Sequence, residues 1–301
     1  MSPHPYASAA YADVFRDTAK PLWVSAWGAH VLLRAIEPGV NDAIGGYPVA
    51  VFDKSADLKA GLEFLKAQGL VSVGLVPDPV GAPPLAELSA AFTLCSPFKA
   101  HALIDYRREV RYSKHHRAEV KRALRWVKVR EVRFRDHLDT WLGLYRELGA
   151  RRALGGMSAL SARAFEQLST VEGLRAVAAF AGKEIVSMHL WVVDGPSGKG
   201  SSLFAASSEK GYACSAAYAV YDASIQLFSD LEILNLGGGA GLTVRADDGL
   251  SRVKAGFANA EAMSMFCGAV LDERRFSQLV GGASMLTLPF PAYRFAKERR
   301  S

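Results

Sequence analysis

Residues 234–257 read LNLGGGAGLTVRADDGLSRVKAGF, and this stretch decides the fold. The sequence predicts a strand at 231–236, a glycine cluster follows, and the spacing of 250–257 predicts a short helix. Glycines at the end of a strand let backbone N–H groups approach a ligand closely. The glycine cluster is therefore either an ordinary turn between strand and loop or a place where the backbone meets a ligand, and Lys254 lies on the short helix that follows.

The flanking sequence predicts alternating helices and strands. Apolar runs at 174–180 and 185–193 surround a four-residue turn and predict a hairpin. Apolar spacing predicts helices over 138–148, 161–168 and 214–228, and further strands at 203–206 and 262–270. This alternation is typical of an α/β domain.

The first third of the chain has the same character. We expect residues 1–36 to be partly helical, 57–68 to form a helix, and 47–52, 70–76 and 100–106 to form strands. With 301 residues in all, the chain is long enough for two domains that each bury a core.

Residues 107–135 carry the densest positive charge. The middle of this stretch lacks glycine and proline, so we expect a helix. At about 100° per residue, one face of it would hold six cations: Arg107, Arg111, Lys114, Lys121, Arg125 and Lys128. Like charges four residues apart repel each other. The stretch is either a solvated surface helix or a face that binds anions.

Composition limits the other classes of protein. The net charge of +6 favours anionic partners but also fits an ordinary basic protein. The three cysteines, Cys95, Cys214 and Cys267, are widely spaced, which argues against a disulfide framework and against a zinc site. No segment has the pattern of a signal peptide or the length of uncharged apolar sequence that spans a membrane, so we expect a cytoplasmic protein without stable membrane insertion and without a metal.

Several segments together resemble the FemAB-like branch of the GNAT acyltransferase superfamily, the Fem-type aminoacyltransferases. The family's final motif, GLxxFKxGFG, is similar to 249–258, although Val253 and Ala258 depart from it. The other segments that carry the resemblance are 45–48 (GGYP), 112–117 (YSKHHR) with 121–123 (KRA), 211–218 (GYACSAAY) and 234–239 (LNLGGG).

The resemblance implies an α/β protein of two tandem GNAT-like domains, with mixed central sheets flanked by helices. Residues 1–130 would form the first domain, on the acceptor side, with the basic helix at its end. Residues 131–275 would form the second, with the transferase cleft, and 276–301 would return to the first domain.

The resemblance also implies transfer of an acyl or aminoacyl group to an amine. No Ser-His-Asp, GxSxG or HExxH pattern supports a covalent or metal route, so direct attack on a positioned donor fits better. The candidate catalytic residues are Lys254, Tyr212 and Ser215, because a cation and a helix start suit developing negative charge. Candidate substrate-binding residues are Tyr47, Tyr218, Arg252, Gly237 and Gly238. Candidate contacts for tRNA phosphates are Lys114, Arg117, Lys121 and Arg122.

The expected donor is aminoacyl-tRNA, with no further cofactor. The acceptor would be a small or peptide-like amine, such as a peptidoglycan precursor or a natural product. An acyl-CoA donor is the alternative; the usual CoA loop begins with Arg or Gln, whereas 208–213 (SEKGYA) begins with Ser208. A second alternative is a non-catalytic RNA- or anion-binding module. His189 lies in an apolar strand, where a core histidine is the commoner outcome.

Overall fold

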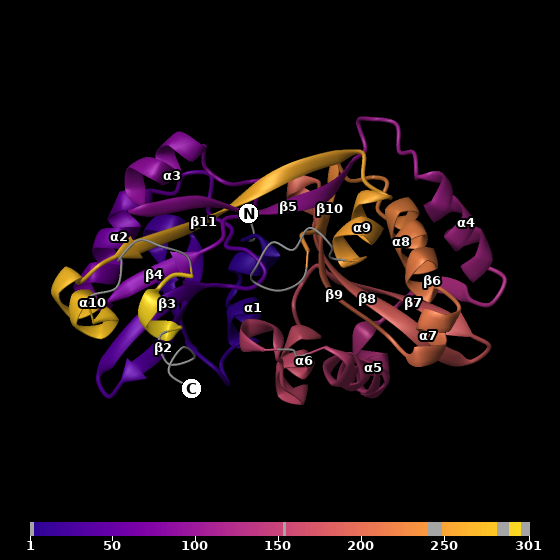
Figure 1. Ribbon diagram of the computed structural model, residues 1–301, viewed down its shortest axis with the longest axis horizontal. Coiled ribbons are helices and arrows are strands. Elements are labelled where there is room, and N and C mark those ends of the chain that lie inside the picture. Colours follow the sequence, from indigo (N-terminus) through magenta and orange to yellow (C-terminus); the bar gives the residue numbers. More distant parts are fainter. Residues whose placement is uncertain (1–2, 153–154, 240–248, 282–288, 296–301) are drawn as a thin grey trace. The chain divides into compact units, whose positions relative to one another are not determined.

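The computed structural model describes residues 3–152, 155–239, 249–281 and 289–295. The chain forms two compact units, residues 1–98 with 263–301 and residues 99–262. Figure 1 shows the elements of each unit. Both units are α/β with a mixed sheet flanked by helices, as the sequence predicts.

The first unit contains a five-stranded sheet in the order β1-β2-β3-β4-β11. Only β3 and β4 run parallel, joined by the helix α2 (Leu58–Ala67). Trp27, Leu65 and Val73 are fully buried at the centre of its core. The strands are β1 (Lys20–Val24), β2 (Ala29–Glu37), β3 (Val40–Gly45), β4 (Ser72–Leu75) and β11 (Ala260–Val270), and the other helices are α1 (Ala9–Asp13), α3 (Leu85–Ala91) and α10 (Glu273–Val280).

The second unit contains a six-stranded sheet in the order β5-β10-β9-β8-β7-β6. Helix α8 packs on one face through Tyr221 against Trp191, and α5 packs on the other face through Tyr145 against Phe204 (Figure 1). The strands are β5 (Leu94–Asp105), β6 (Lys128–Val132), β7 (Leu174–Ala181), β8 (Glu184–Asp194), β9 (Lys199–Ser207) and β10 (Ile233–Gly237). The helices are α4 (Lys114–Ala123), α5 (Leu138–Arg151), α6 (Ala162–Leu168), α7 (Glu209–Ala213), α8 (Ala216–Leu227) and α9 (Gly249–Ala255).

Each unit receives one strand from the other half of the sequence. Strand β5 follows the first unit along the chain but pairs with β10, while β11 follows the second unit but pairs with β4. Residues 99–130 therefore belong to the second unit, not to the first, where the sequence placed them. In the returning tail, Arg294 and Tyr293 bond Asp42 of the first unit.

The expectation that residues 1–36 are partly helical is confirmed, because α1 and the 3₁₀ helices Pro5–Ala7 and Ser25–Trp27 lie there beside β1 and β2. One expectation for the first unit was wrong. Residues 47–52 form no strand: Ala50 makes a single bridge to Pro77, and Pro48 has no amide hydrogen to donate to a ladder. The predicted helix at 57–68 and strand at 70–76 are confirmed.

The expected long basic helix is shorter than predicted. Helix α4 spans Lys114–Ala123, begins at Ser113, whose hydroxyl accepts from the amide of His116, and ends before Arg125. Arg107 and Arg111 precede it, and Lys128 lies in β6. The predicted stripe of six cations on one helix is therefore wrong, although Lys114, Arg117 and Lys121 do share one face of α4 by their spacing.

Candidate functional site

Among the described residues of the second unit, β9 and β10 are the only neighbouring strands that run parallel, and their pairing is short. Strands β10 and β9 pair from Ile233 with Lys199 to Asn235 with Ser201, and no further. Beyond Asn235 the ladder between β10 and β5 is also irregular, with a shift between Asn235 and Gly237. The end of β10 is thus released from the regular sheet where the glycine cluster begins.

Lys254 contacts this end of β10. Its Nζ donates to the carbonyl oxygen of Gly238 at 2.7 Å, and the side chain is buried with 8% of its surface exposed. Gly237 has a φ of 87°, and a Cβ there would lie 2.9 Å from Nζ of Lys254. Glycine is required at this position both for the backbone conformation and for the approach of the ammonium. Three of the predicted site residues are therefore brought together.

A second lysine reaches the same glycines. Nζ of Lys99, on β5, donates to the carbonyl oxygen of Gly239 at 2.9 Å. A Cβ on Gly238 would lie 3.2 Å from the side chain of Lys99. Two ammonium groups thus bond adjacent carbonyls, which concentrates positive charge at one turn.

Two buried side chains, His101 and Asn235, form hydrogen bonds at the start of the glycine turn. Nδ1 of His101 donates to Oδ1 of Asn235 at 3.2 Å, and the amide of Gly237 donates to the same oxygen at 2.8 Å. Burial, the largest cause, lowers the pKa of His101 to about 4; the bond to Asn235 opposes the shift and the charges of Lys254 and Lys99 contribute to it. His101 is therefore neutral at physiological pH, with its proton on Nδ1 and a lone pair on Nε2.

Helix α9, which carries Lys254, is fastened to α4 by His116. Nε2 of His116 donates to the carbonyl oxygen of Val253 at 2.8 Å, and Nδ1 accepts from the hydroxyl of Ser113 at 2.8 Å. A Cβ on Gly256 would lie 1.9 Å from the His116 ring, so glycine is required there by close packing. The segment 112–117, included in the resemblance for its charge, thus also positions Lys254.

Aromatic rings fill the space between α4, α8 and α9. Tyr218 lies against His116 with ring centroids 5.1 Å apart, and Phe257 contacts both Tyr218 and Tyr221. Tyr218, predicted to bind substrate, thus has packing contacts of its own in this cluster. Its phenol remains half-buried rather than fully enclosed.

His189 is buried in β8, as expected of a core histidine. Its ring lies 4.7 Å from that of Tyr221, and Nδ1 has no hydrogen-bond partner among the described residues. Burial lowers its pKa to about 3, and the positive charge of Lys254 contributes to the shift. His189 is therefore a neutral group facing the side of the sheet where Lys254 lies.

Ser215 and Tyr212 have other partners than Lys254. The hydroxyl of Ser215 donates to Oε2 of Glu119 at 2.7 Å and accepts a bond from Arg122, so it ties α8 to α4. Ser215 has a φ of 57°, which is unusual for a residue with a side chain. Tyr212 is 52% exposed, and the guanidinium of Arg151 lies 4.7 Å from its ring centre.

The predicted phosphate contacts lie on the outer face of α4. Lys114, Arg117 and Lys121 are exposed, while Val120 and Ala123 pack against α8 on the inner face. Arg122 differs from the other three, because it forms an ion pair with Glu119 at 2.6 Å. The face available for anions therefore consists of three of the four predicted cations.

Close packing explains the glycine of the segment 208–213, which forms the start and body of α7. A Cβ on Gly211 would lie 2.1 Å from the carbonyl oxygen of Val186, so a side chain cannot be accommodated. The amide of Gly211 donates to the hydroxyl of Ser208, the N-cap of α7, at 3.2 Å. This amide is therefore occupied by the cap, and the glycine needs no bound pyrophosphate to account for it.

The remaining predicted residues lie elsewhere. Arg252 is exposed on α9, whereas Lys254 is buried, as their spacing on a helix predicts. Tyr47 belongs to the first unit, where its carbonyl accepts from the hydroxyl of Tyr11. Residues 240–248 of the stretch 234–257 lie outside the described residues.

Sequence inspection missed Lys99, His101 and Asn235. The signal for Asn235 was an amide between two leucines in the strand segment 233–236. Lys99 and His101 alternate along β5, which places them on one face of the strand. In the described parts of the chain, no group of three or more His, Cys, Asp and Glu side chains could hold a metal, and no helix has the length and apolarity to cross a bilayer.

Comparison with solved structures shows which fold this is. FemX superposes with a TM-score of 0.65 at 12% identity, covering 90% of this chain and 93% of that one. The C-terminal DUF2156 domain of a protein described as a lysylphosphatidylglycerol synthetase from Agrobacterium fabrum gives 0.61 at 15% identity, covering 92% and 91%. L-PGS from Bacillus licheniformis gives 0.57 at 14% identity, covering 91% and 95%.

No protein-family model and no curated protein matches the sequence. The similarity to the three solved structures extends over nine-tenths of the chain and lies in the fold. The expected α/β fold with mixed strands flanked by helices is thereby confirmed, and it is similar to the fold of FemX.

Proposed function

We propose that this chain is an aminoacyltransferase that moves an aminoacyl group from aminoacyl-tRNA to the amine of a small or peptide-like acceptor. The observation that carries the proposal is the position of Lys254, which is buried and bonded to Gly238 where β10 leaves the sheet. The Fem-like fold and the cationic face of α4 support the same reaction.

The reaction would proceed by direct attack of the amine on the ester carbonyl of the donor. A C–N bond forms, the ester C–O bond breaks, and the proton lost by the amine goes to the ribose hydroxyl that leaves. Negative charge develops on the carbonyl oxygen in the tetrahedral intermediate. The ammonium groups of Lys254 and Lys99, fixed on the glycine turn, would stabilise that charge or hold a phosphate of the donor's terminal nucleotide.

The choice of an RNA donor rests on charge and on the segment 208–213 at α7. Lys114, Arg117 and Lys121 lie on one exposed face of α4, which suits a line of phosphates. Gly211 is explained by its contact with Val186, and its amide is bonded to Ser208. These two observations favour tRNA over CoA as the source of the acyl group.

A transfer assay with purified protein tests the proposal. Mixed tRNA charged with radiolabelled amino acids is incubated with a small-molecule extract containing amines, and labelled amide products are separated from free amino acid. We expect amides to form with the wild-type chain and not with Lys254→Ala. Amides formed at equal rates by both proteins would refute the assignment of Lys254.

A further inference from the structure

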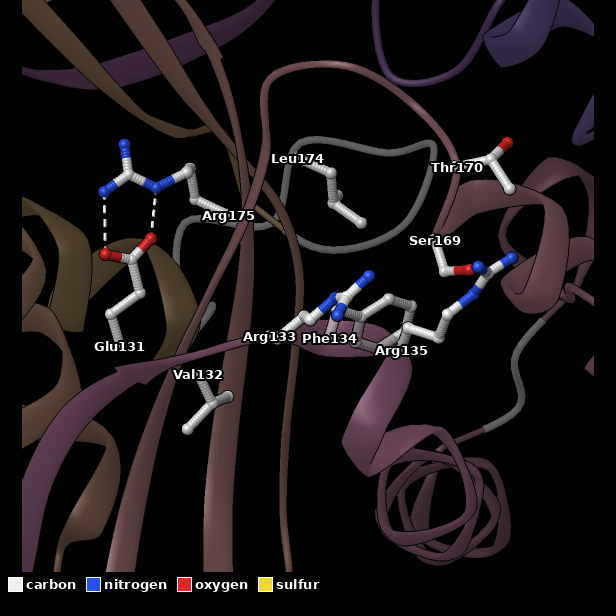
Figure 2. Close-up of a pocket in the computed structure, with 9 residues that line it drawn as sticks. All are labelled: Glu131, Val132, Arg133, Phe134, Arg135, Ser169, Thr170, Leu174 and Arg175. Carbon is white, nitrogen blue, oxygen red and sulfur yellow. Dashed lines mark hydrogen bonds and ion pairs between the residues drawn. The ribbon is translucent and has the colours of Figure 1, made fainter.

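A pocket of about 490 Å³ lies at the edge of the second unit's sheet, where β6 runs into the 3₁₀ helix η3 (Phe134–His137). Figure 2 shows the side chains of Arg133 and Arg135 extending from this short segment toward Leu174 and Ser169. The pocket is lined by Glu131, Val132, Arg133, Phe134, Arg135, Ser169, Thr170, Leu174 and Arg175.

The lining of this pocket has more positive than negative charge. Glu131, the one acidic side chain in the lining, is paired with Arg175 by two bonds, one of them 2.7 Å from Nη2 to Oε2 (Figure 2). Arg133 and Arg135 have no ion pair or side-chain hydrogen bond with the described residues. The lining therefore keeps two positive charges after its own acid has been neutralised.

Several other arginines nearby in the sequence are paired with a carboxylate. Arg107 and Arg108 bond Asp105, Arg111 bonds Glu109, and Arg122 bonds Glu119. Arg133 and Arg135 instead lie together beside one cavity. Two guanidinium groups in one pocket are suited to bidentate recognition of phosphate oxygens.

The packing of Phe134 determines where Arg133 and Arg135 lie. Phe134, between them, is buried and packs against Trp141 with ring centroids 6.0 Å apart. Because the central side chain points into the core, its two neighbours are left to project outward on the rim of the pocket. Three further exposed cations precede the pocket in the sequence: Lys121 in α4, and Lys128 and Arg130 in β6.

We propose that this pocket binds phosphate groups of the RNA donor, with Arg133 and Arg135 as the contacts. The inference rests on the proposed function, because it assumes an RNA donor. It extends that function from the reacting end of the tRNA to a second contact on its backbone.

The sheet order sets the distance between the two contacts. Strand β6 lies four strands from β10 in the order β10-β9-β8-β7-β6. At about 4.8 Å per strand, the pocket is roughly 19 Å from the glycine turn across the sheet. A contact so far from the reacting ester contributes to binding and not to the chemical step. Its loss should therefore raise KM and leave kcat unchanged.

The experiment measures binding of deacylated tRNA to the full chain by fluorescence anisotropy over a series of salt concentrations. The test variant is Arg133→Gln with Arg135→Gln. The matched control is Arg146→Gln with Lys183→Gln, which removes two exposed cations of the same unit away from the pocket. A Lys variant at both pocket positions keeps the charge and tests whether the forked geometry matters.

We expect the pocket variant to bind tRNA at least about tenfold more weakly, with the slope of log K against log salt reduced by between about 1 and 2. The control pair should bind as the wild type does, and the Lys variant should fall between. Equal binding by the pocket variant and the control would overturn the pocket assignment while leaving the transferase proposal intact. A wild-type chain that binds no tRNA would overturn both.

A parallel arm uses vesicles of phosphatidylglycerol, because a lipid headgroup also carries a phosphate. If the pocket variant lost vesicle binding but kept tRNA binding, the pocket would be a lipid site and the proposal would be wrong. Thermal melts of all the variants show whether the fold is kept.

Discussion

Nε2 of His116 lies 2.8 Å from the carbonyl oxygen of Val253, one residue before Lys254. The two residues are separated by 137 positions in the sequence and join α4 to α9. Helix α9 has only seven residues, too few to be stable without such contacts. The position of Lys254 at the glycine turn therefore depends on α4.

Substitution of Gly256 by alanine tests this dependence. A Cβ at Gly256 would meet the His116 ring, so the ring or the helix must move, at a cost of about 1–3 kcal/mol. We expect a lower melting temperature and a lower rate of transfer. Gly249→Ala is the control, since a Cβ there meets nothing within 4 Å. Equal effects of the two substitutions would contradict the proposed role of the contact.

Lys254→Ala should reduce kcat/KM for transfer by about 100-fold or more, the loss usual when one group that stabilises an oxyanion is removed. Arg252→Ala removes an exposed cation two residues away and should leave the rate within a few-fold of wild type. Steady-state kinetics with labelled donor compares the two. A larger loss for Arg252→Ala would move the functional cation to the other face of α9.

Ser215→Ala separates a structural from a chemical role of this hydroxyl. The variant loses the bonds to Glu119 and Arg122, so we expect about 1 kcal/mol less stability in urea denaturation and a transfer rate within a few-fold of wild type. Ser215→Gly loses the same bonds but removes the strain of the left-handed backbone, so it should be the more stable variant. Complete loss of transfer in both would instead show that the hydroxyl takes part in the reaction.

Much of the second unit follows from its sequence. The hairpin of β7 and β8, the helix α6, and the strand–glycine–helix order around β10 are local patterns, and local patterns can be read from neighbouring residues. The order of motifs likewise led to a fold similar to that of FemX. Lys254 could be placed near the glycine cluster because a cation on a short helix after such a cluster is a local feature.

The pairing of β5 with β10, and of β11 with β4, could not be predicted from local patterns. Pairing of β5 with β10 joins residues more than a hundred positions apart, and no local pattern specifies such a partner. The bond of His101 to Asn235, 134 residues away, depends on that pairing. The true length of α4 was missed for another reason: charge periodicity continued beyond residues 114–123, while tertiary pairing made β6 a strand.

Stability should fall in mild acid because of the buried histidines. Burial lowers the pKa of His189 to about 3, so in the folded chain it stays neutral while the unfolded chain takes up a proton below about pH 6.5. The free energy of unfolding should therefore decrease as the pH falls from about 6.5 toward 3, at up to about 1.4 kcal/mol per pH unit for this one proton.

Urea denaturation between pH 4 and 7.5 measures this slope. His189→Phe keeps the ring against Tyr221 and removes the proton uptake, so its slope should be shallower than that of wild type by about one proton. An unchanged slope in His189→Phe would show that His189 titrates normally in the folded chain.

The source of the transferred group is the central claim, and one measurement addresses it directly. The same purified protein is given radiolabelled aminoacyl-tRNA in one reaction and labelled acyl-CoA in another, each with and without RNase and each with an amine-containing extract. We predict labelled amides from aminoacyl-tRNA alone, abolished by RNase and by Lys254→Ala. Amide formation from acyl-CoA that is insensitive to RNase would contradict the account.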